Sequence, residues 1–194
     1  MLLVILIILL GLLLWHIIYV IRTGPESINY FIVVPLLVAL GFGGYWEATW
    51  WAGEKTGSGL VVYASKVDGA SLNCQRPEET LLDVRPFLKG FVSWDNPTVA
   101  NLKYSECVEL FSYLESNKLN PTSEQAYALE VLVHESMHVA GYRNEAETEC
   151  AAMARYVDVA VQSGATQEVA ERMLADYKQN WWPLLPNSYK SSCT

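Results

Sequence analysis

The segment HESMH, residues 134–138, places two histidines four positions apart with a glutamate directly after the first. On a helix, residues four apart lie on one face, so His134 and His138 can grip a single ion. Glu135 lies about 100° round from His134, where it can face a metal-bound water without binding the metal itself. The spacing therefore predicts a zinc-binding helix in which Glu135 serves as the general base.

The third ligand must come from another part of the chain. The sequence holds three histidines, and the one outside the motif, His16, lies in an apolar N-terminal run, so a carboxylate is expected to complete the site. A second helix is predicted to begin at Asn144, soon after the first ends. On it Glu145 and Glu149 share one face, whereas Glu147 points about 200° away from Glu145. The residues alone leave Glu145 and Glu149 both open as the third ligand.

HESMH followed by a helix reading E-x-x-x-E resembles the gluzincin class of zinc metallopeptidases. Residues 100–190 also resemble small secreted or membrane-anchored bacterial zincin-like proteins of unassigned function. The resemblance implies a Zn²⁺ cofactor, Glu145 as the third ligand, and Glu149 as the carboxylate that orients a ligand histidine. It further implies hydrolysis of a peptide or protein substrate through a zinc-bound water, with the substrate main chain paired to an edge strand at 90–94 or 98–104.

The helix that carries the motif has clear start and stop signals. It is predicted to begin either at Asn120 before Pro121 or at Thr122, which forms a capping box with Gln125. Gly141 is well placed to end it in the left-handed conformation. The local sequence thus predicts a capped, amphipathic helix, as the metal site requires.

The remaining sequence predicts an α+β domain, mainly helical with a short sheet and of zincin type. The segment 72–89 is expected to be irregular, with one helical turn near Leu81. Helical periodicity continues outside the motif, and β-branched and aromatic runs mark strands. The predicted helices begin at Ser105, Asn144 and Thr166, and the predicted strands cover residues 60–67, 90–94 and 98–104.

The N-terminal quarter of the chain is strongly apolar. Residues 2–21 carry no charge and are long enough to cross a bilayer, and residues 30–46 form a second, less regular apolar stretch. We expect both to contact membrane lipid as transmembrane helices. The sequence therefore predicts a membrane anchor over residues 1–53, a flexible linker at 54–59 and the zincin-like domain over 60–194.

All four cysteines follow the apolar stretches, and none forms a C-x-x-C pair. Dispersed cysteines in even number are typical of disulfides in an oxidising compartment. We predict bonds between Cys74 and Cys193, closing the two ends of the domain, and between Cys107 and Cys150, bracing the metal site. Together with Arg22 in the connector, this favours a domain outside the cytoplasm, anchored in the plasma (inner) membrane.

The net charge of −8 argues against a nucleic-acid partner. Two other functions compete with an outward-facing zinc peptidase. One is a non-catalytic binding or assembly domain stabilised by zinc or by disulfides. The other is an intramembrane peptidase, which is disfavoured because the motif helix carries Glu124, Glu130 and Glu135.

Overall fold

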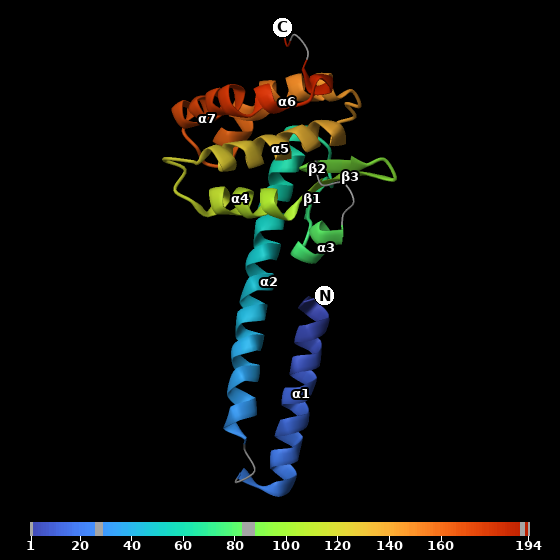
Figure 1. Cartoon of the computed structure of the whole chain (residues 1–194), viewed down its shortest axis with the longest axis vertical. Helices are drawn as coiled ribbons and strands as arrows, with labels where there is room; N and C mark the ends of the chain where they lie inside the picture. Colours follow the sequence, from blue (N-terminus) through green and yellow to red (C-terminus); the bar gives the residue numbers. More distant parts are fainter. Residues whose placement is uncertain (1, 26–28, 83–87, 191–192, 194) are drawn as a thin grey trace. The chain divides into compact units, whose positions relative to one another are not determined.

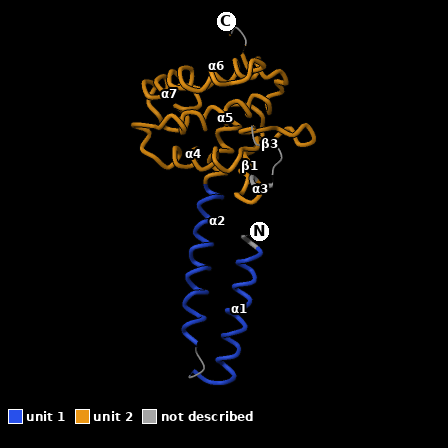
Figure 2. The backbone as a smooth tube through the Cα atoms, viewed as in Figure 1, with its two compact units in different colours: residues 1–52 blue, residues 53–194 orange. Residues whose placement is uncertain are grey.

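The structure is a computed structural model that describes residues 2–25, 29–82, 88–190 and 193. It is mostly helical with one small sheet (Figure 1). The chain divides into two compact units, residues 1–52 and residues 53–194 (Figure 2). Each unit is described by itself below.

The first unit consists of two apolar helices. Helix α1 covers Leu2–Thr23, and α2 covers Tyr30–Ser65, beginning in the first unit and continuing into the second. Both are long and apolar enough to cross a membrane, a weak criterion that a signal sequence would also meet. The predicted spans at 2–21 and 30–46 fall within them.

The flexible linker predicted at residues 54–59 is wrong, and so is the strand predicted at 60–67, because α2 runs unbroken through the first segment and on to Ser65 in the second. Leu60, Val61 and Ala64 are buried at the spacing of one helical face. Packing of this face outweighs the weak strand preference of the β-branched residues around it.

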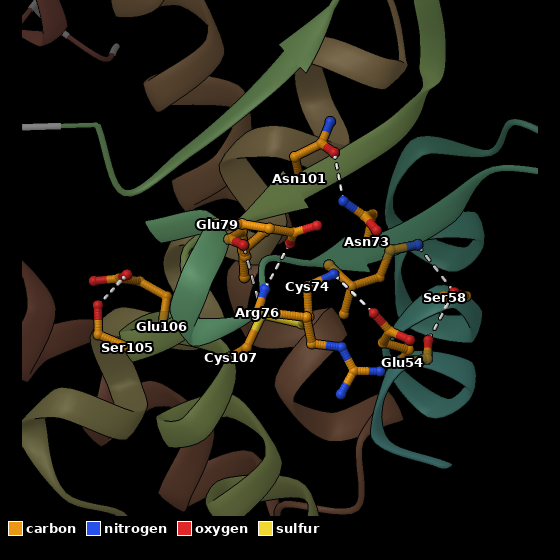
Figure 3. Close-up of a disulfide and its surroundings, with 12 residues drawn as sticks. Glu54, Ser58, Asn73, Cys74, Arg76, Glu79, Asn101, Ser105, Glu106 and Cys107 are labelled. Atoms are coloured by element: carbon orange, nitrogen blue, oxygen red, sulfur yellow. Dashed lines mark hydrogen bonds between the residues drawn. A yellow bond between two sulfur atoms is a disulfide. The ribbon is translucent and has the colours of Figure 1, made fainter. Parts of the chain in front are cut away.

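Polar contacts tie this part of α2 to the first strand, β1, which covers Ser71–Cys74 (Figure 3). The Glu54 carboxylate accepts a hydrogen bond from the Cys74 backbone N–H at 3.0 Å. The Ser58 hydroxyl accepts one from the Leu72 N–H at 2.9 Å. Two residues of the predicted linker thus satisfy the backbone of β1 instead.

The sheet has the order β1-β3-β2, with β3 (Asn96–Leu102) parallel to β1 and antiparallel to β2 (Gly90–Ser93). The strands predicted at 90–94 and 98–104 are confirmed with shifted ends. Because β3 is central, β2 is an edge of this sheet among the described strands.

The segment predicted to be irregular, residues 72–89, is partly ordered. It holds most of β1 and a short helix, α3 (Pro77–Leu82), which includes the helical turn expected near Leu81. Residues 83–87 lie outside the described part of the chain. The sequence did not reveal β1 because four residues carry little periodic signal and their pairing partner is distant in the chain.

Four helices complete the second unit, and α5, which carries the motif, packs against β2, β3 and the other three (Figure 1). Two short 3₁₀ turns follow α7. The bounds are α4 Tyr104–Glu115, α5 Ser123–Val139, α6 Glu145–Gln162 and α7 Gln167–Asn180, with the turns at Trp182–Leu184 and Asn187–Tyr189.

The predicted helix ends around the motif are confirmed. Thr122 caps α5, and its capping box with Gln125 has both reciprocal hydrogen bonds. Gly141 follows α5 with φ 103°, a left-handed conformation that glycine adopts without strain. Asn144 caps α6 through its side chain.

Both predicted disulfide pairings are wrong, because Cys74 bonds to Cys107 (Figure 3) and Cys150 bonds to Cys193. The parallel register of β1 and β3 sets Cys74 opposite Leu102, only five residues before Cys107. Sheet pairing therefore brings these two cysteines together, with Cα atoms 5.9 Å apart. Cys150 then bonds the C-terminal segment to α6.

Candidate metal centre

Three side chains from two helices converge on one point. Glu145 Oε2, at the start of α6, lies 3.1 Å from His134 Nε2 and 3.3 Å from His138 Nε2, both on α5. The three ligand atoms all lie within 4.8 Å of one another. The tight turn through Gly141 reverses the chain and brings Glu145 onto the two histidines. This group could hold a metal ion.

The other nitrogen of each histidine is held by a neighbour. Glu149 Oε2 lies 3.0 Å from His134 Nδ1, and Glu149 is itself fixed by the Tyr177 hydroxyl, which donates to Oε1 at 2.6 Å. His138 Nδ1 lies 2.9 Å from the Tyr142 carbonyl oxygen, which can only accept. These bonds orient both rings so that each Nε2 points to the shared centre.

A second group overlaps the first and includes a residue that the sequence reading did not assign to the site. Glu130, His134 and Glu149 also offer ligand atoms within 4.8 Å of one another, and all three are buried. Burial, followed by the charge of Glu149, raises the pKa of Glu130 well above its ordinary value. A neutral Glu130 beside Glu149 makes a poorer metal ligand than Glu145, which is partly exposed.

Glu135 lies beside the centre without joining either group. Burial raises its pKa to about 7, although the two histidines act in the opposite direction. Its Oε2 is buried and has no hydrogen-bond partner among the described residues. Gly90 on β2 allows its close approach, since a Cβ there would lie 2.7 Å from Glu135 Oε1.

Electrostatics couples the three proposed ligands in the metal-free protein. Burial lowers the pKa of His134 and of His138, but hydrogen bonds to Glu145 outweigh it, so both pKa values are raised. The same bonds lower the pKa of Glu145. These hydrogen bonds therefore favour the protonated imidazoles and the ionised carboxylate, and a metal ion bound here would replace protons.

Tyr189, in the last 3₁₀ turn, is a neighbour of the centre that the sequence reading missed. Its ring packs against His134 with centroids 5.4 Å apart. Burial raises its pKa, with the negative charge of Glu145 adding to the effect. Tyr156, on α6, is fully buried and donates to the Ala126 carbonyl, so it belongs to the core.

Two cavities of about 190 and 170 Å³ flank the centre. Leu88, Gly90, Glu135 and Tyr189 line both of them. The larger is mainly apolar and reaches Tyr127, while the smaller follows β2. Two segments were predicted to pair with a substrate. Of these, β2 borders the centre and is an edge strand, whereas β3 is hydrogen-bonded to β1 on one side and to β2 on the other.

One sequence signal could have indicated that Tyr189 lies near the centre. Tyr189 stands between Pro186 and Cys193, and the disulfide of Cys193 to Cys150 attaches the C-terminal segment to α6. The predicted site residues themselves come together, namely His134, Glu135, His138, Glu145 and Glu149. Searches against protein-family models, curated proteins and solved structures found no match.

Proposed function

We propose that the protein is a membrane-anchored zinc-dependent peptidase of gluzincin-like, zincin type. The observation that carries the proposal is the convergence of His134, His138 and Glu145. Two ligands about 2.1 Å from a tetrahedral zinc lie about 3.4 Å from each other. The distances of 3.1 and 3.3 Å from Glu145 Oε2 to the two histidine nitrogens are close to this value.

The donor set also fits zinc by number and chemistry. Two imidazoles and one carboxylate form a common catalytic zinc set, whereas structural zinc sites almost always have four protein ligands. Glu149, by holding His134 Nδ1, supplies the outer carboxylate that such histidines usually have. This count favours a catalytic site over a purely structural one.

Zinc bound there would polarise a substrate carbonyl and lower the pKa of water. Glu135 would take the proton from the attacking water and pass it to the leaving amine. Its buried, unpartnered Oε2 and its pKa of about 7 suit a group that accepts and returns a proton near neutrality. Tyr189 lies where its hydroxyl could donate to the substrate oxygen.

A peptide would bind in extended form along β2. Edge strands offer unpaired backbone groups to which a peptide can add as a further strand. Gly90, the first residue of β2, is next to Glu135, so a peptide on this edge would pass the proton acceptor. The two flanking cavities would then receive side chains on either side.

The apolar helices and the disulfides support a proposal for the cellular location of the site. Two N-terminal helices meet the criterion for membrane spans, and two disulfides fit an oxidising compartment. We therefore place the domain outside the plasma (inner) membrane. Labelling of single introduced cysteines by a membrane-impermeant reagent in intact cells tests this, and labelling only after lysis would contradict it.

The test of activity uses full-length protein in detergent, loaded with zinc and assayed on a library of fluorogenic peptides. Glu135→Gln should retain about one zinc per chain and lose activity by roughly 10²- to 10⁴-fold. Glu147→Gln, an exposed change on the same helix as Glu145, is the matched control. A non-catalytic binding domain would bind zinc but cleave no peptide in either form.

A further inference from the structure

The smaller cavity beside the centre is lined by one arginine, Arg143. Glu135, His138 and Glu145 of the proposed centre line it together with Trp94 and Arg143. Arg143 follows the turn after α5, and Trp94 follows β2, so two loops meet here. The proposed chemistry uses neither residue.

Arg143 is held by stacking. Its guanidinium carbon lies 4.7 Å from the centre of the Trp94 ring, within cation–π range. The Trp94 ring in turn meets His138 edge-on, at 6.2 Å between centroids and an angle of 89°. Among the described residues no carboxylate lies within ion-pair distance of Arg143. A planar cation with five N–H donors is thus stacked on Trp94 at the cavity, where it has no ion-pair partner among the described residues.

The charge of the cavity depends on the metal. With both imidazoles neutral, as a bound metal requires, Glu135, Glu145 and Arg143 sum to a formal charge of −1. A divalent cation on the histidines and Glu145 turns the sum to +1, because a bound ion is usually the largest charge of its site. With the metal bound, the cavity therefore attracts an anion, and the N–H donors of Arg143 orient that anion.

We propose that Arg143, backed by Trp94, binds a carboxylate of the substrate, either an Asp or Glu side chain or the chain terminus. The proposal rests on the proposed peptidase function and adds to it a substrate class. From the two stacking distances, the guanidinium carbon lies no more than about 11 Å from the His138 ring. An extended peptide advances about 3.3 Å per residue, so the carboxylate lies within three residues of the cleaved bond.

The experiment compares peptides that differ by Glu or Gln at each of the three positions on either side of the bond, with free or amidated C-termini. Zinc-loaded full-length protein should prefer the carboxylate at one position by about tenfold in kcat/KM. Amidation removes only the terminal carboxylate, so a preference that survives in the amidated series identifies a side-chain carboxylate and one that is lost identifies the chain terminus. In Arg143→Gln the ratio of kcat/KM for the Glu peptide to that for the Gln peptide should fall toward one. In Arg143→Glu the same ratio should fall below one.

Lys178→Gln removes one exposed positive charge far along α7 and should leave the preference unchanged. If Arg143→Gln does not fold, Trp94→Leu removes the stacking partner instead. Binding of fluorescein-labelled Glu and Gln peptides to zinc-loaded Glu135→Gln, followed by anisotropy, gives a readout without hydrolysis. Cleavage or binding with no difference between Glu and Gln peptides overturns the proposal. Discrimination in binding with no cleavage by the wild type would overturn the peptidase function alone.

Discussion

The two carboxylates of α6 should respond differently to the loss of their charge. Glu145 Oε2 faces both histidine Nε2 atoms, whereas Glu149 Oε2 faces the opposite nitrogen of His134 at 3.0 Å. Glu145→Ala removes one of the three proposed ligands. Glu149→Gln keeps all three ligands and weakens only the support of one.

The magnitudes follow from these positions. Replacing an outer partner of a ligand histidine typically weakens metal binding 10- to 100-fold, about 1.4–2.7 kcal/mol. Glu149 is 1% exposed and accepts a hydrogen bond from Tyr177, so the amide of a glutamine at this position cannot rotate freely. We therefore expect Glu149→Gln to weaken zinc binding by an amount within this range. Glu145→Ala should lose more than about 100-fold.

Zinc affinity is measured by competition with a chromophoric chelator at constant pH, with metal content of the purified protein as a second readout. Glu147→Gln, exposed on the same helix, should bind zinc like the wild type. Loss of the metal in Glu149→Gln together with its retention in Glu145→Ala would refute the assignment of Glu145 as the third ligand. That result would make the buried group of Glu130, His134 and Glu149 the ligand set.

Three further predictions follow from the same geometry. Zinc binding at pH 7 should release protons and tighten as pH rises, because both proposed ligand histidines have raised pKa values without zinc and zinc binds only the neutral imidazole. Calorimetry in buffers of different ionisation enthalpy should detect the proton release, and binding heats that do not vary with the buffer would contradict it. Gly90→Ala should displace Glu135, lower the free energy of unfolding by about 1–3 kcal/mol and remove most of the peptidase activity, while the zinc content stays near one per chain. Thermal melting, a peptide assay and metal analysis measure the three effects, and normal turnover would show that the close approach is dispensable. Replacing Cys150 and Cys193 together by serine opens a loop with a sequence separation of 43, worth about 4 kcal/mol, and should lower the melting temperature by roughly 10 °C, so an unchanged melting curve would rule out a stabilising role.

Some features of the site could be predicted because they depend on residues close together in the chain. A helix period places His134 and His138 on one face, and a capping box needs only Thr122 and Gln125. The turn at Gly141 needs one residue able to adopt positive φ. Each of these signals lies within a few positions, so no knowledge of the rest of the fold was required.

The same local logic failed where packing outweighed composition. The glycine- and serine-containing segment 54–59 has the composition of a linker, yet it is helical and hydrogen-bonded to β1. The β-branched run 60–67 has the composition of a strand, yet its apolar residues pack as a helix face. Strand β1 exists because of its partner β3, about 28 residues away, and its own four residues hardly predict it.

What the sequence determined by itself is therefore the motif helix, its ends and the set of acidic residues that could serve it. What only the tertiary structure decided is which nitrogen each carboxylate of α6 meets, which cysteines bond, and that Glu130, Tyr189 and Arg143 stand beside the centre. The physical reason is that these contacts join residues on different elements. Their distances depend on how helices and strands pack, and no period or cap within one element specifies that packing.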